Sequence, residues 1–289
     1  MQVVGIIGAG MMGSGVAQTA AQFGYRVLQT DVSLEAAEKG KASITKSFDT
    51  LVGRGKLDAA DAKTYLSRIT PVGDYGPLAE ADLIIEAATE REEVKHKIFE
   101  QAAQVLKADA VLASNTSSIP ITRMAARLPD PARFIGMHFF NPVPIMGLIE
   151  IIPGLPTSQA TTDKARAFAE SLKKEVVLAG DEPGFIVNRI LCPMLNEAIF
   201  VLGAGMGSIE DIDKGCRIGL NHPMGPLTLA DFVGLDTLFE IIKVLYATTG
   251  DSKYRQAPLL VKYVEAGWIG RKVGRGFYDY SSGTPVPTR

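Results

Sequence analysis

The sequence predicts an α/β protein with a doubly wound N-terminal domain followed by an all-α C-terminal domain. Up to about residue 178, apolar strand-like segments alternate with helical segments, which is typical of a mainly parallel sheet. Beyond residue 184 the strand signals fade and helical patterns follow one another. A segment rich in Gly and Pro separates the two regions and predicts domains at residues 1–183 and 184–289.

The chain opens with a strand and a glycine-rich turn. An apolar, β-branched run over residues 3–7 leads into the sequence GAGMMG. Gly8 permits a tight turn, Gly10 lets the backbone approach a pyrophosphate, and Gly13 permits close contact between helix and strand. A helix over residues 14–23 then offers its N-terminal amides to phosphate groups. This order predicts a Rossmann-type, dinucleotide-binding domain.

A second strand, residues 25–30, is followed directly by Asp31. Its carboxylate can accept hydrogen bonds from both hydroxyls of an adenosine ribose. The same negative charge would repel a 2′-phosphate. The sequence therefore predicts NAD rather than NADP as the cofactor.

The alternating pattern continues with helices at residues 34–51 and 58–67, strands at 83–86 and 111–114, and a helix at about 91–106 between those strands. Loops follow each of these two strands, at the carboxyl edge where open α/β sheets bind ligands. Candidate cofactor or substrate contacts in these loops are Glu90, Asn115 and Ser117. Each could equally be a helix cap or a loop bond.

Basic side chains gather along the first of these helices and the turn after it. They are Lys39, Lys41, Lys46, Arg54 and Lys56. Most such groups are solvated helix faces. The other interpretation is that some of them bind a polyanionic part of a substrate, such as a diphosphate.

A predicted hairpin brings a histidine and a carboxylate together. Residues 133–140 and 147–152 are predicted strands, and the sequence NPVP between them predicts a turn. If the strands run antiparallel about Pro144, His138 lies opposite Glu150. A carboxylate on one imidazole nitrogen raises the basicity of the other and stabilises the imidazolium. The pair predicts proton-transfer chemistry, with a purely structural pair as the alternative.

A helix at residues 158–172 and a strand at 175–178 complete the first domain. The second domain is predicted to contain helices at 185–202, 209–217, 226–246 and 259–266. Asn188 falls in the first turn of the first of these helices, near a boundary between domains, where pockets tend to form. Residues 281–289 are expected to be a frayed tail.

Bulk composition limits the class of protein. The chain has 289 residues, 46% hydrophobic content and a net charge of -2. The hydrophobic content supports a sizeable core. The slightly negative net charge gives no positive potential that would attract nucleic acid or a membrane surface. No apolar run approaches the roughly 20 residues that span a bilayer. Because the first strand starts at residue 2 or 3, no signal peptide is expected. With only Cys192 and Cys216, a disulfide scaffold or zinc site is not expected either. We therefore expect a cytoplasmic location.

Three other residues are assigned structural roles. His96 lies among charged residues and is expected on an exposed helix surface. His222 lies in a loop rich in Pro and Gly, where a local bond is expected. Trp268, the only tryptophan, is expected to be a packing anchor near a dimer or domain contact.

Taken together, these motifs resemble those of the 3-hydroxyacyl-CoA dehydrogenase family, and within it the short 3-hydroxybutyryl-CoA dehydrogenases. The resemblance covers nearly the whole chain. It rests on the sequences GAGMMG at 8–13, ASNTSS at 113–118, HFFNP at 138–142, PGFIVNR at 183–189, NHPMGP at 221–226 and GRGFY at 274–278. Such a series of long motifs in order is far more specific than a dinucleotide-binding turn alone.

The resemblance implies an NAD-dependent enzyme that interconverts 3-hydroxyacyl-CoA and 3-oxoacyl-CoA. It implies that His138 is the catalytic base, with Glu150 as its partner, and that Ser117 and Asn188 bind the reacting part of the substrate. It also implies a homodimer formed through the helical domain. Further residues that the family likeness assigns are Glu90, Lys95, Asn115, Asn141 and Lys272 around the NAD, and Arg54 or Lys56 near the coenzyme A phosphates.

Two positions depart from the family pattern, and two rival functions stay open. Gly147 and Thr50 stand where several relatives carry basic side chains, which leaves the coenzyme A contacts and the acyl length undetermined. The nearer rival is an NAD-dependent dehydrogenase of a free hydroxyacid or sugar acid, because fold and dyad do not by themselves require coenzyme A. The more distant rival is a non-catalytic NAD-binding protein.

Overall fold

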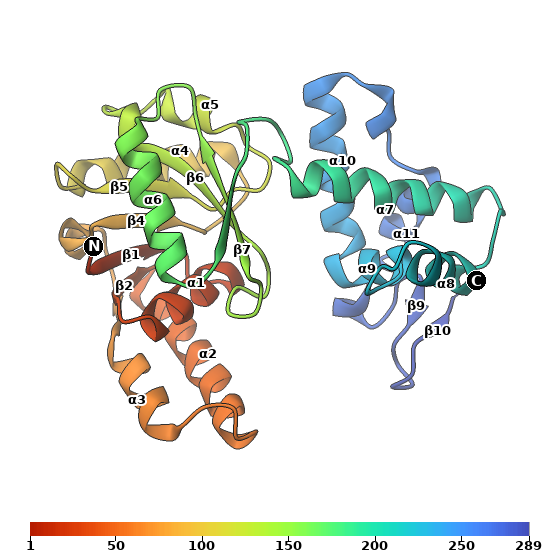
Figure 1. The fold of residues 1–289 in the computed structure, drawn as a ribbon, viewed down its shortest axis with the longest axis horizontal. Helices are drawn as coiled ribbons and strands as arrows, with labels where there is room; N and C mark the ends of the chain where they lie inside the picture. Colours follow the sequence, from red (N-terminus) through yellow and green to blue (C-terminus); the bar gives the residue numbers. More distant parts are fainter. Residues whose placement is uncertain (289) are drawn as a thin grey trace. The chain divides into compact units, whose positions relative to one another are not determined.

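The computed structural model describes residues 1–288, and the chain divides into two compact units, Met1–Glu182 and Pro183–Arg289. The first unit is built around one large sheet, and the second is mainly helical (Figure 1).

An eight-stranded sheet forms the centre of the first unit, with the order β3-β2-β1-β4-β5-β6-β7-β8. Adjacent strands are parallel except β6 and β7, which are antiparallel. This is the doubly wound topology that the sequence predicts. The strands are β1 Val3–Ile7, β2 Arg26–Thr30, β3 Ile69–Val72, β4 Leu83–Glu86, β5 Val111–Ser114, β6 Phe134–Phe139, β7 Leu148–Pro153 and β8 Glu175–Leu178.

Helices cover both faces of this sheet. One face packs against α1, α2 and α6 in a single apolar core, while α4 and α5 contact strands of the same sheet outside that core. Figure 1 shows α2 and α3 extending beyond the sheet as a helical hairpin. The helices are α1 Met11–Gln22, α2 Leu34–Gly53, α3 Ala59–Ser67, α4 Glu92–Val105, α5 Ile121–Ala125 and α6 Gln159–Ser171, with 3₁₀ turns η1 Gly76–Glu80 and η2 Pro131–Arg133.

Helix α1 packs closely on the sheet because its buried side chains are small. Ala17, Ala20 and Ala21 are completely buried, and a β-carbon on Gly13 would collide with the carbonyl oxygen of Gly8. The helix begins at Met11, three residues before the predicted start, with Gly10 as its N-cap. The glycine turn therefore leads straight into the first helical turn, with no loop between them.

The second unit has α7 at its centre, in contact with the four other helices of the unit. Its core includes Leu195, Leu227, Leu238, Leu260 and Phe277, all fully buried. The elements are α7 Val187–Gly203, α8 Ile209–Gly219, α9 Pro226–Val233, α10 Leu235–Thr249, η3 Ser252–Tyr254, α11 Pro258–Glu265, η4 Arg271–Val273, β9 Tyr278–Asp279 and β10 Val286–Pro287.

Two predictions for the second unit are wrong. The single helix expected at 226–246 is divided by Gly234, whose φ of 97° lies in a region that favours glycine and cannot continue a helix. The tail is not frayed throughout, because Val286 and Pro287 pair with β9 and the amide of Thr288 bonds to the carbonyl of Phe277. The last residue of the predicted tail, 289, lies outside the described residues.

The sequence also failed to predict β3. Its central proline removes a hydrogen-bond donor, and the segment has only four residues. Such a strand is tolerated at the edge of a sheet, which is where β3 lies. Among residues 1–288, no helix is both long and apolar enough to cross a membrane.

Candidate active site

The glycine turn has the geometry that its sequence requires. Gly8 has a φ of 112°, and a β-carbon there would lie 2.5 Å from the carbonyl oxygen of Ala87. A β-carbon on Gly13 would meet backbone, whereas one on Gly10 would meet nothing within 4 Å. Thus two glycines are required by packing, while Gly10 faces open space.

That open space suits the pyrophosphate of a dinucleotide. No side chain caps the N-terminus of α1, so its first amides keep their capacity to bind an anion. A cavity of about 460 Å³ begins at Ala9, Gly10 and Met11 and continues past α2 to residues 141–145. The uncapped helix, the open glycine and the adjoining cavity together fit a nicotinamide dinucleotide.

Asp31 follows β2 and is bonded to the glycine turn. One of its carboxylate oxygens accepts a hydrogen bond from the amide of Ala9 at 2.5 Å, and the other accepts one from the amide of Val32 at 2.7 Å. The side chain stays partly exposed, and a carboxylate has acceptor positions beyond these two. Asp31 can therefore order the turn and still accept bonds from a ribose.

Glu90 holds the loop that carries Ser117. Its Oε1 accepts hydrogen bonds from Thr116 Oγ1 (2.7 Å), Ser118 Oγ (3.0 Å) and both the amide (2.8 Å) and Oγ (3.2 Å) of Ser117. Burial alone would raise the pKa of Glu90, but the Lys95 ammonium and these hydrogen bonds hold it below its ordinary value. The carboxylate is thus kept ionised as the acceptor for the whole loop.

Lys95 lies behind Glu90, almost completely buried. Its Nζ is 2.5 Å from Glu86 Oε2 and 3.6 Å from Glu90 Oε2. Ser114 Oγ donates to the same Glu86 oxygen at 2.9 Å. Burial is tolerable for this ammonium because two carboxylates face it. Glu86, which the sequence did not single out, completes a buried network that joins the ends of β4 and β5.

Asn115 connects the ends of β5 and β6. Its side-chain oxygen accepts a hydrogen bond from the backbone amide of Phe139 at 2.8 Å. Its backbone amide donates a hydrogen bond to the carbonyl oxygen of Glu86, also at 2.8 Å. The structure therefore brings the loop containing Ser117 beside the strand containing His138.

His138 and Glu150 are directly paired across β6 and β7, as the sequence predicts. Nδ1 of the histidine lies 2.7 Å from Oε2 of the glutamate, and both side chains are buried. The ring of Phe140 lies against the imidazole with centroids 4.6 Å apart. A buried carboxylate on Nδ1 fixes the orientation of the ring and leaves Nε2 as its other polar atom.

Asn141 follows these residues and is exposed, lining the 460 Å³ cavity together with the turn after it. The cofactor candidates Gly8, Asp31, Glu90, Asn115 and Asn141 thus all follow the carboxyl ends of neighbouring strands. This is the sheet edge at which the sequence places the cofactor.

The other candidates belong to helices and turns rather than to the loops that follow the strands. Arg54 and Lys56 are exposed at the end of α2. Asn188 belongs to the second unit, in the first turn of α7, where it is partly exposed. Lys272, also in the second unit, donates a hydrogen bond to Asp236 Oδ2 at 2.6 Å.

The expectation for His96 is wrong. The residue is 3% exposed, on the face of α4 that also buries Lys95, Phe99 and Ala102. Its charged neighbours in the sequence suggested a solvated face, but the i, i+3 and i+6 spacing to Phe99 and Ala102 is the signal that indicates burial. Its Nε2 lies 3.5 Å from Glu92 Oε1.

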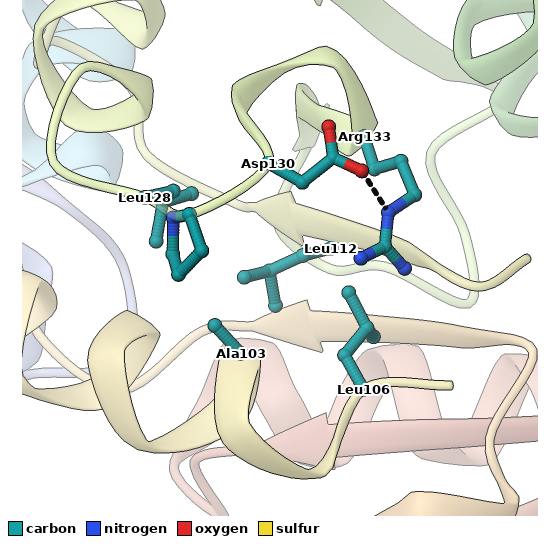
Figure 2. A pocket seen from close by; sticks show the side chains of 7 residues that line it. Ala103, Leu106, Leu112, Leu128, Asp130 and Arg133 are labelled. Carbon is teal, nitrogen blue, oxygen red and sulfur yellow. Dashed lines mark hydrogen bonds and ion pairs between the residues drawn. The ribbon is translucent and has the colours of Figure 1, made fainter. Parts of the chain in front are cut away.

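A second, small cavity of about 30 Å³ lies near Leu112 and Arg133 (Figure 2). Figure 2 shows the Arg133 guanidinium bonded to Asp130, with Leu106 and Ala103 on the opposite side. A volume of this size holds about one water molecule. It contains none of the candidate site residues. Among the described residues, no group of three or more His, Cys, Asp or Glu is arranged to hold a metal ion.

Comparison with known proteins gives matches over almost the full length. Residues 3–182 match the family model for the 3-hydroxyacyl-CoA dehydrogenase NAD-binding domain, and residues 184–280 match the model for the C-terminal domain of the same family. A 3-hydroxybutyryl-CoA dehydrogenase from Bradyrhizobium diazoefficiens is 53% identical over 99% of this chain and 98% of its own length.

A probable 3-hydroxybutyryl-CoA dehydrogenase from Bacillus subtilis is 48% identical over 96% of this chain and 97% of its own. The crystal structure of an (S)-3-hydroxybutyryl-CoA dehydrogenase from Ralstonia eutropha superposes with a TM-score of 0.93 at 48% identity, over 97% of this chain and 99% of that chain.

Proposed function

The chain belongs to the 3-hydroxyacyl-CoA dehydrogenase family, and from that premise we propose that it interconverts (S)-3-hydroxybutyryl-CoA and acetoacetyl-CoA with NAD. The observation that carries the proposal is the buried His138–Glu150 pair on the sheet from whose carboxyl edge the glycine turn begins. The (S) configuration is taken from the named Ralstonia eutropha relative.

In the oxidative direction, His138 takes the proton of the 3-hydroxyl group. Nδ1 is bonded to Glu150, so Nε2 is the atom that exchanges the proton. NAD supplies the hydride acceptor for the carbon that bears this hydroxyl. The oxygen keeps the electron pair of its O–H bond and forms the carbonyl, and Glu150 stabilises the imidazolium. In reduction, the imidazolium returns the proton to the oxygen.

Ser117 and Asn188 bind and orient the reacting part of the substrate in this proposal. Support for Ser117 comes from its loop, which Glu90 and Asn115 hold next to the strand of His138. Correct orientation of the reacting atoms can lower the activation barrier by on the order of 7 kcal/mol or more. Asn188→Ala and Ser117→Ala should therefore lower turnover of acetoacetyl-CoA while the affinity for NADH is retained.

The exposed cations at the end of α2 bind the coenzyme A phosphates in this proposal. Arg54 and Lys56 form no ion pair among the described residues, so both are available to an anion. Arg54→Ala should raise the KM for acetoacetyl-CoA but not the KM for an acetoacetyl-pantetheine thioester, which lacks the nucleotide. An equal rise for both thioesters would exclude a phosphate contact.

A homodimer formed through the second unit completes the proposal. Large apolar side chains stay exposed on this unit, among them Ile190, Met206, Ile218 and Leu220. Apolar side chains of this kind mark an interface where they form one contiguous patch. Sedimentation equilibrium should give twice the chain mass, and a mass of one chain would contradict the proposal.

The decisive test follows the absorbance of NADH during incubation with acetoacetyl-CoA, beside free acetoacetate and beside NADPH. Rapid consumption of NADH with the thioester alone is the expected result. Equal or faster use of a free hydroxyacid or oxoacid would assign the chain to the rival class of free-acid dehydrogenases. Tight NADH binding without turnover of any acyl-CoA would instead indicate a non-catalytic NAD-binding protein.

A further inference from the structure

A buried lysine outside the catalytic pair bonds to the loop that connects β6 and β7. This loop comprises residues 140–147, and we call it the β6–β7 loop. Nζ of Lys174, which directly precedes β8, donates hydrogen bonds to the carbonyl oxygens of Val143 at 2.7 Å and Met146 at 2.6 Å. The next residue adds a third bond, because the amide of Glu175 donates to the carbonyl of Gly147 at 2.7 Å.

The lysine occupies an environment that normally disfavours its charge. Its residue is 8% exposed, and burial lowers the pKa of the ammonium. No carboxylate among residues 1–288 forms an ion pair with it, and its ammonium is bonded instead to the two carbonyl oxygens of the loop. Charge-assisted bonds of this kind are stronger than bonds between neutral groups, and breaking them leaves buried polar groups unsatisfied.

The bonded loop forms part of the wall of the cofactor cavity. Asn141, Val143 and Ile145 line the 460 Å³ cavity together with Gly10 and Ser14. Val143 also packs directly on α1, where a β-carbon added to Gly15 would lie 2.9 Å from the β-carbon of Val143. The position of this loop therefore determines the space available beside the glycine turn.

We propose that Lys174 is a positioning residue for the cofactor, because its ammonium fixes the β6–β7 loop against helix α1 and so shapes the NAD cavity. The inference rests on the proposed function only in the identity of the reaction, since the NAD-binding domain is shown by the family match. Lys174 acts through the loop and touches neither substrate nor cofactor in this scheme.

The test compares Lys174→Met, which keeps the aliphatic length and removes the charge, with Lys173→Met as a matched control. Lys173 is the adjacent residue and is exposed. Among the described residues, its side chain forms no hydrogen bond or ion pair with the β6–β7 loop. Lys174→Arg, which retains the cation, is the rescue variant. Each protein is examined in full length for NADH affinity by fluorescence titration, for steady-state kinetics and for amide hydrogen exchange.

Two changes are expected in Lys174→Met. The amides of Ile145 and Met146 donate hydrogen bonds to the carbonyl oxygen of Pro142. These amides should exchange faster, because the loop loses its hydrogen bonds from the Lys174 ammonium. If the loop then holds the binding position about a tenth of the time, the Kd for NADH should rise about tenfold. The kcat at saturating NADH should change far less, because the His138–Glu150 pair lies on strands that stay paired.

Lys173→Met should match the wild-type protein, and Lys174→Arg should recover most of the NADH affinity. A Lys174→Met protein that melts at a lower temperature, yet exchanges its loop amides and binds NADH as the wild type does, would show a merely structural role and overturn the proposal. If Lys174→Met does not fold, Lys174→Gln takes its place, and unchanged exchange and affinity there overturn the proposal equally.

Failure of the proposed function has a different signature. In that case the wild-type protein binds NADH without turning over acetoacetyl-CoA, while the loop exchange and NADH affinity of the Lys174 variants can still be measured. The positioning role and the identity of the reaction are thus tested by separate observations.

Discussion

The side-chain oxygen of Asn115 accepts a hydrogen bond from the amide of Phe139 at 2.8 Å. Phe139 directly follows His138, so the loop after β5 is bonded to the strand that carries the histidine. Glu90 holds the other end of that loop through Ser117 and its neighbours. The serine and the histidine that we propose for substrate binding and proton transfer therefore belong to one hydrogen-bonded structure.

Removing either member of the buried dyad should abolish most of the proton transfer. His138→Gln and Glu150→Gln are each expected to lower kcat by about 10² to 10⁴-fold, the range typical of a positioned general base and its partner. Both substitutions leave the glycine turn intact, so NADH titration should give a Kd close to that of the wild type. Near-normal turnover in either variant would mean that the proton moves through another group.

Two glycines of one turn should respond differently to the same added methyl group. Gly13→Ala places a β-carbon against the backbone oxygen of Gly8, which cannot move away as a side chain can. Its free energy of unfolding in urea should fall by about 1 to 3 kcal/mol or more.

Gly10→Ala is the matched variant, because its β-carbon meets no protein atom within 4 Å. It should unfold at the wild-type urea concentration and yet bind NADH more weakly, since the methyl group occupies the space proposed for the pyrophosphate. Wild-type affinity in Gly10→Ala would place the cofactor elsewhere.

Asp31 should control the choice between NAD and NADP. Asp31→Ser removes the charge that repels a 2′-phosphate and keeps an acceptor near the amide of Ala9. The ratio of kcat/KM for NADH to kcat/KM for NADPH should therefore fall by about tenfold, equivalent to about 1.4 kcal/mol. An unchanged ratio would assign the discrimination to a different residue.

Glu90 should make folding stability depend on pH in the acid range. Its pKa in the folded protein is lowered, with burial opposing and the Lys95 ammonium and loop hydrogen bonds favouring the charged form. A lowered pKa contributes stability that is present above the unfolded-state value of about 4.3 and is lost as the pH falls through the folded-state value.

Urea unfolding of the wild type and of Glu90→Gln at several pH values measures this contribution. The wild type should be more stable at neutral pH, and the difference should shrink below about pH 4. A difference that stays constant across this range would mean that Glu90 stabilises the loop through packing rather than through its charge.

The parts of the fold that the sequence predicts correctly depend on local patterns. The alternation of buried strands and helices gives the doubly wound sheet, and a short turn fixes the register that places position 138 opposite position 150. The break at Gly234 was missed because the flanking residues are apolar on both sides, and only the backbone angle ends the helix.

Two polar residues that were missed lie among charged neighbours. Lys174 lies between Lys173 and Glu175, and His96 lies between Lys95 and Lys97, so composition predicts a solvated surface in both places. The spacing of His96 to Phe99 and Ala102 could have indicated its burial. The burial of Lys174 depends instead on partners far along the chain, such as the carbonyl of Val143, 31 residues away. Local periodicity carries no information on such partners, which only the assembled sheet brings together.

His138 and Glu150 are only 12 positions apart along the chain. Closing so short a segment costs little chain entropy compared with pairing parallel strands through long crossovers. The base and its partner can therefore meet within a single hairpin, and the integrity of that hairpin matters more for the dyad than the length of any distant loop. Insertions in surface loops far from this hairpin should leave the dyad intact. One residue added between His138 and the end of β6 would instead turn the imidazole and the carboxylate to opposite faces of the sheet.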